Sequence, residues 1–287
     1  MDPLYAADKV PLGTEHYENF PVASILLPKK IRRAITDIYI FARTADDIAD
    51  EGNMPEDSRL KKLDFYAEQL YLIANNIQPS YPLFANLFDT INIFNLPIEL
   101  FHDLLFAFKQ DVIKNRYDNF NELLYYCHYS ANPIGRLLLI LTNCASLENC
   151  LLSDKICTGL QLINFWQDIE SDLQLRNRCY LPLDEMQVLQ ITPEDILLHK
   201  NISQSEYLLS TLLSRTASIY AEGIKLQHQV PGRMGFEIGM MIAGGKLILQ
   251  TLQQRDSIYK RPILSKFDFI RIFFSTFYTL MLKDKFL

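Results

Sequence analysis

Apolar residues recur at three- and four-residue steps along most of the chain, and this periodicity limits the available folds more than any other feature. Within residues 29–50 the following positions share one helix face: Ile31, Ala34, Ile35, Ile38, Ala42, Ala45 and Ala49. Such spacing is typical of an amphipathic helix. The pattern returns in residues 56–77, 97–115, 120–144, 153–175, 203–227 and 234–254, and we find no series of strands. We therefore predict an all-α protein in which residues 1–287 form a single domain around one central space.

The bulk composition narrows the classes of protein that remain. Apolar residues make up 49% of the 287 residues and only 10 are glycine, which suits a large core. The net charge of −6 argues against a general nucleic-acid binder. The cysteines lack zinc-ligand spacing and are typical of reduced thiols: Cys127, Cys144, Cys150, Cys157 and Cys179. No signal peptide or membrane-spanning stretch is recognisable, so we expect a cytoplasmic protein.

Two segments carry a polar stripe beside their apolar residues, and each stripe contains a pair of aspartates four residues apart. The stripes consist of Tyr39, Arg43, Asp46 and Asp50 in one segment and of Gln161, Asn164, Asp168 and Asp172 in the other. On a helix these steps place each set along one line. A single pair is a weak signal, because surface helices carry many. Two pairs in apolar helices, each with hydrogen-bonding neighbours, indicate a shared site.

Four carboxylates gathered in a helical bundle would repel one another strongly unless cations neutralised them. Mg²⁺ prefers carboxylate oxygens and often completes its shell with water and phosphate oxygens. The pattern therefore predicts Mg²⁺ bound together with a diphosphate, with Arg43 and Arg178 adding positive charge. Mg²⁺ would stabilise the negative charge that grows as the C–O bond of the diphosphate breaks. The alternative is two unrelated acidic faces exposed to solvent.

If the organic fragment of such a substrate is an allylic or cyclopropylcarbinyl group, it would leave as a carbocation, which requires an apolar, aromatic pocket that excludes stray water. Core packing is the simpler role for any one of the candidate aromatic residues: Phe20, Tyr39, Phe41, Tyr126, Tyr129, Phe165 and Trp166. Tyr126 and Ser130 share a helix face, and Pro133 is expected to kink that helix beside a cavity. His128 is either a ligand or base, or a hydrogen-bonded structural histidine.

Three segments together resemble the main signatures of squalene and phytoene synthases: "YIFARTADDIADE", "YYCHYSANPIG" and "QLINFWQDIESD". The resemblance extends from about His16 to Arg261 and implies the all-α isoprenoid synthase fold, a central active-site cavity, three Mg²⁺ ions and a prenyl diphosphate. It implies metal binding by Asp46, Asp50, Asp168 and Asp172, and a role for Tyr126 in proton transfer beside the departing diphosphate. The residues that match substrate-binding positions are Arg43, Gln161, Asn164 and Arg178 at the diphosphate, with His16, Phe20, Tyr39, Tyr180 and Arg261 along the site.

Departures from the common family pattern indicate which branch of the family the chain resembles most. Gln167 stands where many members have a basic residue, and Ser130, Asn132 and Pro133 stand where valine, glycine and an apolar residue are common. Together "ENFPVAS", "YSANPIGRL" and "NFWQD" resemble the bacterial hydroxysqualene synthase branch. Its members ionise presqualene diphosphate and capture the rearranged cation with water, without NADPH. We therefore predict that Ser130, Asn132 or Gln167 holds the captured water, as part of the substrate-binding set.

The resemblance also implies separate enzymes that supply presqualene diphosphate and reduce the alcohol to squalene, commonly for hopanoids. Two other functions stay open: condensation of two farnesyl diphosphates to presqualene diphosphate or a carotenoid precursor, and a non-catalytic lipid-binding or assembly factor. Residues 267–287 are rich in Phe and Leu and carry Lys283 and Lys285 near their end. This segment is either a last core helix or a contact with the surface of the inner membrane.

Overall fold

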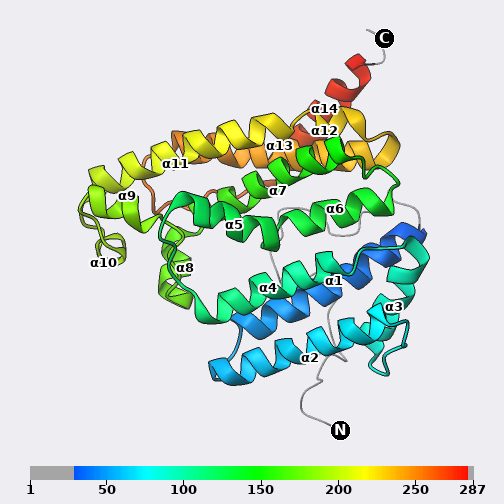
Figure 1. The fold of residues 1–287 in the computed structure, drawn as a ribbon. Helices are drawn as coiled ribbons and strands as arrows, with labels where there is room; N and C mark the ends of the chain where they lie inside the picture. Colours follow the sequence, from blue (N-terminus) through cyan, green and yellow to red (C-terminus); the bar gives the residue numbers. More distant parts are fainter. Residues whose placement is uncertain (1–28, 284–287) are drawn as a thin grey trace. The chain divides into compact units, whose positions relative to one another are not determined.

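The computed structural model describes residues 29–283, and within them the chain is helical, as the sequence predicts. These residues contain no strand, although Arg116 and Cys179 form an isolated β-bridge. The chain divides into two compact units, the first ending at Ile113 and the second beginning at Lys114 (Figure 1). The all-α class is therefore confirmed, whereas a single domain around one central space stays a prediction.

The first unit is built on a buried aromatic core. Its helices are α1 (Lys29–Asp50), α2 (Glu56–Ala74), α3 (Pro82–Phe94) and α4 (Glu99–Ile113). The ring of Phe41 in α1 is fully buried and lies 5.6 Å from that of Tyr66, 6.4 Å from Phe84 and 5.4 Å from Phe101, between ring centroids. The predicted apolar face of α1 is thus largely the buried one, and the polar stripe beside it stays half-buried.

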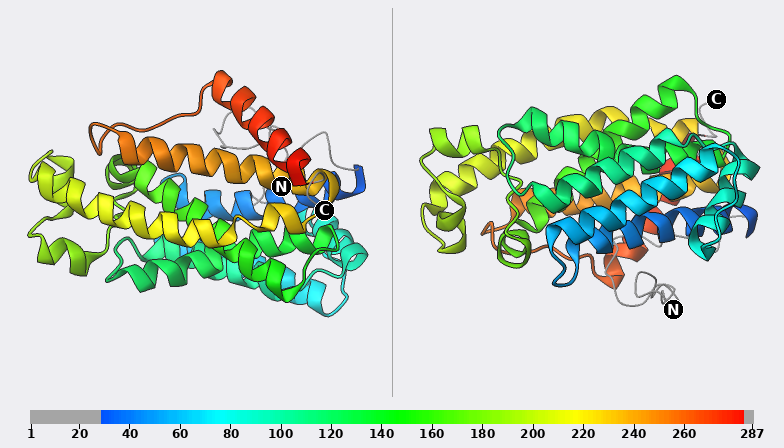
Figure 2. Two further views of the ribbon diagram at one scale, coloured as in Figure 1. Left: turned by 90° about the horizontal axis from the view of Figure 1, so that it is seen from above. Right: turned by 60° about the horizontal axis from the view of Figure 1, so that its bottom comes forward.

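The second unit is organised around one long helix. Its elements are α5 (Phe120–Ser130), α6 (Asn132–Leu141), α7 (Leu147–Gln167), α8 (Ile169–Arg176), α9 (Leu183–Val188), α10 (Pro193–Leu197), α11 (Ile202–Gly223), α12 (Leu226–Gln229), α13 (Gly232–Gln254) and α14 (Lys266–Lys283). Helix α7 contacts α5, α6, α11 and α13 (Figure 2). A Cβ atom at Gly159 or Gly245 would lie 2.5 Å from Tyr220, so these glycines allow α7, α11 and α13 to pack closely.

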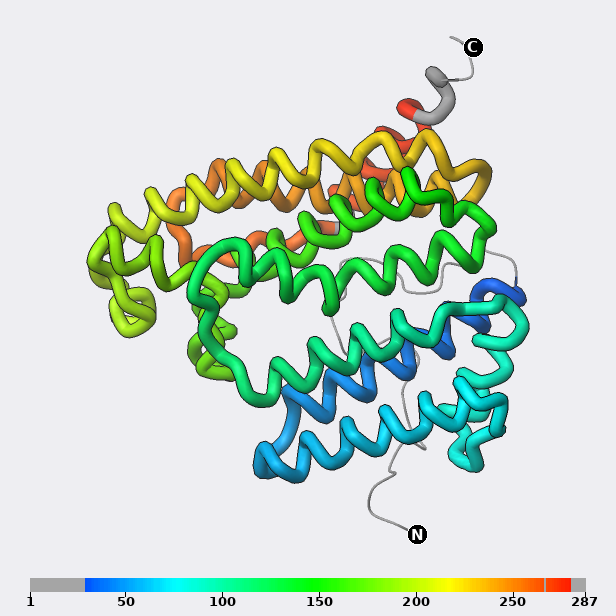
Figure 3. Tube along the Cα trace, viewed as in Figure 1, coloured from blue at the N-terminus to red at the C-terminus, as the bar shows by residue number. Residues whose placement is uncertain are grey.

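Residues 120–144 form two helices, where the sequence predicted one kinked helix. Helix α5 ends at Ser130, Ala131 lies between the two, and α6 begins at Asn132 with Pro133 in its first turn (Figure 3). Proline has no N–H to donate to the preceding turn, whereas its fixed φ suits the start of a helix. Pro133 therefore ends one helix and starts another, which is a stronger effect than the expected kink.

Residues 153–175 also depart from the predicted continuous helix. Helix α7 ends at Gln167 and α8 begins at Ile169, while Asp168 between them has φ −111° and ψ 17°. One candidate metal ligand therefore sits at a helix junction instead of within a helix. Within residues 29–283, no helix combines the length and the apolar character needed to cross a bilayer.

Candidate active site

The first aspartate pair lies at the C-terminal end of α1, beside an arginine that contacts three carboxylates. Arg43 lies 3.3 Å from Asp46, 2.6 Å from Asp47 and 3.0 Å from Glu51, measured between nitrogen and oxygen atoms. Burial alone would lower the pKa of Arg43, but the carboxylates of Asp47, Asp46 and Glu51 raise it. Asp50 is half-buried in the last turn of α1. Arg43 therefore already neutralises carboxylates at the acidic end of its own helix.

Asp47 and Glu51 were not among the sequence-predicted site residues. Asp47 follows Arg43 by four positions, a spacing that brings side chains together on a helix and that would have identified the pair. The chain after Asp50 is fixed by Arg59 of α2, whose guanidinium donates to the carbonyls of Ala49, Gly52 and Met54. This contact holds the end of α1, and with it the position of the acidic residues.

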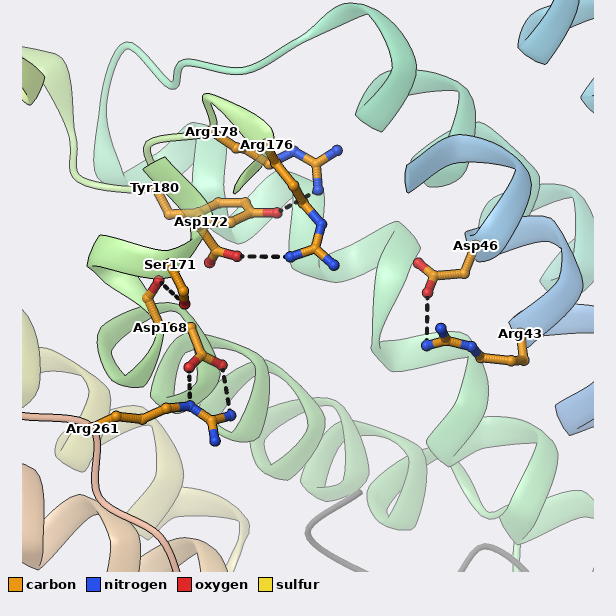
Figure 4. A network of polar contacts seen from close by, with 9 residues as sticks. All are labelled: Arg43, Asp46, Asp168, Ser171, Asp172, Arg176, Arg178, Tyr180 and Arg261. Atoms are coloured by element: carbon orange, nitrogen blue, oxygen red, sulfur yellow. Dashed lines mark hydrogen bonds and ion pairs between the residues drawn. The ribbon is translucent and has the colours of Figure 1, made fainter. Parts of the chain in front are cut away.

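The second aspartate pair spans the junction between α7 and α8 (Figure 4). Asp168 forms a bidentate ion pair with Arg261: Nε bonds Oδ1, and Nη2 donates to Oδ2 over 3.2 Å. Asp172 lies 3.4 Å from Arg176, one turn further along α8. The two carboxylates are largely buried, with side chains 26% and 15% exposed. The structure thus places Arg261 against Asp168 and Arg176 against Asp172. The sequence analysis missed Arg176, although it stands four positions after Asp172.

Aromatic rings pack against one another around Tyr180 within the second unit. The ring of Tyr180 stacks on Phe165 with 3.6 Å between centroids, and Tyr126 lies 6.0 Å from Phe165 and 6.2 Å from Tyr180. Buried Arg178 donates to the hydroxyl of Tyr180 over 3.2 Å. Tyr117, which the sequence gave no reason to select, is fully buried and stacks on Tyr180 at 5.4 Å. Tyr126, Arg178 and Tyr180 are therefore brought together as one cluster.

The three residues predicted to hold water differ in their hydrogen bonding. The Oγ of Ser130 is buried and has no hydrogen-bond partner among the described residues. Asn132 is buried, and its Oδ1 accepts from Thr158 over 3.0 Å. Gln167 donates from Nε2 to the carbonyl of Pro262 over 2.5 Å, and its buried Oε1 lacks a partner within residues 29–283. Ser130 and Gln167 thus each present an unfilled buried polar atom.

The remaining predicted residues fall into different environments. Tyr39 and Gln161 are half-buried and Asn164 is exposed. His16 and Phe20 lie outside the described residues. Phe41 and Trp166 are fully buried, and Trp166 donates from Nε1 to Thr216 over 2.8 Å, so both serve the cores of their units. His128 is exposed, with its ring edge-on to Tyr129 at 4.9 Å.

The donor atoms suit Mg²⁺ when each aspartate pair is considered by itself. Asp46 and Asp50 come from successive turns of α1, and Asp168 and Asp172 lie four residues apart across the α7–α8 junction, so each pair supplies hard carboxylate oxygens. Among the described residues, no group of three or more His, Cys, Asp or Glu is placed to hold a metal. Mg²⁺ commonly binds one or two carboxylates and takes its other ligands from water and phosphate, so the pairs fit that mode of binding.

Comparisons with known proteins agree with these features. Residues 14–268 match the family model described as squalene/phytoene synthase. The chain is similar to the hydroxysqualene synthases of Rhodopseudomonas palustris (35% identity, covering 93% of this chain and 90% of the relative) and Sinorhizobium fredii (32%, covering 88% and 85%). It also resembles the crystal structure of squalene synthase HpnC from Alicyclobacillus acidocaldarius, with a TM-score of 0.76 and 34% identity over 83% of this chain and 89% of that one. The chain therefore belongs to the squalene/phytoene synthase family.

Proposed function

We propose that this chain is a hydroxysqualene synthase, which ionises presqualene diphosphate and captures the rearranged cation with water. The proposal rests on the 32–35% identity to relatives of that name over most of the chain. The site supports it through two aspartate pairs, accompanying arginines and a buried aromatic cluster. Hydroxysqualene and diphosphate would be the products, within the formation of squalene and hopanoids.

Asp46, Asp50, Asp168 and Asp172 would hold the Mg²⁺, which supplies positive charge to the leaving diphosphate. The family resemblance implies three such ions. Arg178 and Arg261 would bind the diphosphate oxygens, because guanidinium groups bind phosphate through paired N–H donors. Both lie in the same unit as Asp168. Arg43 is already shared by three carboxylates, so its contribution would be to orient the acidic end of α1.

The aromatic cluster would keep bulk water away from the cation. Tyr126, Phe165 and Tyr180 bury their rings against one another, and aromatic faces attract positive charge. The hydroxyl of Tyr126 would move a proton beside the diphosphate. A selected water must still enter, and Ser130 is suited to hold it because its buried Oγ has an unfilled hydrogen-bonding capacity.

Two other activities fit the same family. The first is a squalene synthase, which would give a hydrocarbon instead of an alcohol; the similar crystal structure is of a protein with that name. Condensation of two farnesyl diphosphates is the second alternative, since squalene synthases share the family. A non-catalytic lipid-binding role is disfavoured, because it gives the two aspartate pairs and their arginines no evident use.

The test is a product assay with the full chain. Presqualene diphosphate and farnesyl diphosphate are supplied separately with Mg²⁺, each with and without NADPH, and products are identified by mass spectrometry. We expect hydroxysqualene from presqualene diphosphate, no requirement for NADPH, and no turnover after chelation of the metal. Turnover of farnesyl diphosphate would instead identify a condensing enzyme, and squalene formed only with NADPH would identify a reductive synthase.

We also propose that the enzyme works at the surface of the inner membrane, facing the cytoplasm. Helix α14 exposes Phe267, Phe274 and Tyr278, with 83%, 64% and 65% of each residue's surface accessible. An aromatic helix face beside basic residues is typical of interfacial binding. Such a position would suit the exchange of apolar substrate and product with a presqualene diphosphate synthase and a squalene-forming reductase.

A further inference from the structure

The connector between α13 and α14, residues 255–265, contacts the α7–α8 junction at successive residues. Arg255 donates from Nη2 to the carbonyl of Trp166 over 3.2 Å. Gln167, which follows Trp166, donates from Nε2 to the carbonyl of Pro262 over 2.5 Å, and the residue is only 4% exposed. The last carbonyls of a helix need partners from outside the helix. The connector supplies the partner at the end of α7.

The same connector also binds the next part of the junction. Arg261 forms the bidentate ion pair with Asp168. Tyr259 stacks on His199 with 3.7 Å between ring centroids, and His199 Nε2 lies 3.0 Å from Oε1 of Glu170 in the first turn of α8. Contacts from one short segment therefore reach the end of α7 and Asp168 directly, and the first turn of α8 through His199. We call residues 255–262 the clasp.

Arg255 is the most buried charged residue of the clasp. Burial lowers the pKa of its guanidinium to about 10, which still leaves it charged at neutral pH. Its Nη1 donates to the carbonyl of Lys260 over 3.4 Å, which closes the clasp on itself. A charged donor to a helix-end carbonyl makes a stronger bond than a neutral one. Arg255 is thus placed to fix the junction without touching Asp168.

We propose that the clasp positions Asp168 and that Arg261 keeps this carboxylate neutralised until a divalent cation displaces the guanidinium. The bidentate pair occupies both oxygens of Asp168, so a metal ion and Arg261 compete for the same atoms. Arg255, bound to a backbone carbonyl, remains in place during the exchange. This inference rests on the proposed function, because it takes Asp168 as a metal ligand.

The competition predicts an increase in metal affinity when Arg261 is removed. Mn²⁺ binding to the ligand-free full chain is measured by electron paramagnetic resonance for wild type, Arg261→Gln and Lys260→Gln. Lys260 is an exposed neighbour in the same connector, so its variant controls for the lost positive charge. We expect Arg261→Gln to bind Mn²⁺ about 3- to 10-fold more tightly than Lys260→Gln, the range of a partly exposed ion pair. Equal or weaker binding would overturn the guarding role.

Asp168→Asn separates this inference from the proposed function. If Asp168→Asn weakens Mn²⁺ binding while Arg261→Gln does not strengthen it, the guarding role fails and the metal site stands. If Asp168→Asn leaves Mn²⁺ binding unchanged, Asp168 is not a metal ligand and both ideas fail at this residue. Product formation from presqualene diphosphate is scored independently of either result.

The anchoring role of Arg255 has its own readout. The amide of Asp168 donates to the carbonyl of Asn164, and that of Asp172 donates to Asp168, so both amides report on the junction. We expect Arg255→Met to speed hydrogen exchange there about 10-fold and to lower turnover about 10- to 100-fold, as for supports of metal ligands. Arg255→Lys retains a charged donor and should restore slow exchange. Exchange unchanged in Arg255→Met would overturn the anchor.

Discussion

Ser130 is a candidate to hold the water that captures the cation. Its Oγ is buried and lacks a hydrogen-bond partner within residues 29–283, whereas Asn132 already accepts from Thr158. An unfilled buried hydroxyl costs about 1–3 kcal/mol unless water or a ligand fills it. Ser130 is therefore the first of the three predicted residues to test for water capture.

We expect Ser130→Val to lower the share of alcohol among the products of presqualene diphosphate by about 10-fold, because valine cannot hold a water. Consumption of the substrate should continue, since Ser130 contributes no charge to the leaving group. Ser130→Thr retains the hydroxyl and is the matched control. If Ser130→Val, Asn132→Gly and Gln167→Arg all leave the alcohol unchanged, none of these side chains holds the water.

Asp37 in α1 gives a prediction about stability. Its Oδ2 accepts from Thr90 over 2.7 Å, and burial raises the pKa of its carboxyl above the ordinary value of 3.8 despite that bond and nearby Arg33. The folded chain therefore holds this proton more tightly than the unfolded chain. The resulting stability is fully present below about pH 3.8 and is lost as the pH rises through the raised pKa.

Asp37→Asn keeps an acceptor for Thr90 without a charge, so it should unfold at higher urea concentration than wild type at neutral pH. The difference should shrink as the pH falls toward about 4, because wild type then regains its proton. Asp64→Asn, at an exposed position paired with Lys109, is the control and should show no such trend. A variant less stable than wild type at neutral pH would mean that the charged carboxylate is needed.

At the residue scale, sequence spacing predicted pairs within one helix better than pairs between distant segments. The aspartate pairs and Arg43 could be located because their partners lie three or four positions away. Arg261 and Asp168 are 93 positions apart, and Arg255 and Trp166 are 89 apart. The family resemblance suggested Arg261, but no local pattern indicated Arg255.

At the scale of elements, periodicity predicted most long helices but not all of their ends. The break before α6 follows from Pro133, although the sequence suggested only a kink. The break at Asp168 has no glycine or proline beside it, and its stabilising contacts come from the distant clasp. Helix α3 was not predicted, although its buried residues Leu83, Leu87 and Ile91 are spaced four apart, a pattern that is visible in the sequence.

Helix α14 and the residues next to it have the charge and the exposed rings expected of a contact with a membrane surface. Residues 255–287 have a net charge of +4, from seven Lys and Arg and three Asp, whereas the whole chain carries −6. The segment therefore opposes the rest of the chain in sign and would be attracted to anionic lipid. Its exposed phenylalanines would enter the interface.

We expect the full chain to sediment with vesicles containing phosphatidylglycerol and much less with pure phosphatidylcholine vesicles. Phe274→Ser combined with Phe277→Ser should weaken binding about 10-fold or more, since each ring contributes apolar area. Tyr71→Ser, at an exposed aromatic position in α2, should bind like wild type. If the double variant binds vesicles as well as wild type does, or if wild type stays in solution, this face is not the lipid contact.

At the scale of the whole molecule, the two aspartate pairs come from different compact units of the chain. If both act on one diphosphate, Asp46→Asn and Asp168→Asn should each lower kcat/KM about 10³-fold, and the double variant should lose far less than the product of the two losses. Asp64→Asn is again the control. Multiplicative losses would mean that the pairs act independently, and full activity of either variant would remove that pair from the site.

In the proposed reaction a water molecule captures the final cation, so the origin of the oxygen atom in the product is the quantity to measure. Presqualene diphosphate is converted by the full chain with Mg²⁺, without NADPH, in water labelled with oxygen-18. We expect hydroxysqualene whose hydroxyl carries the label, and no squalene among the products. An alcohol without the label, or a hydrocarbon as the main product, would contradict it.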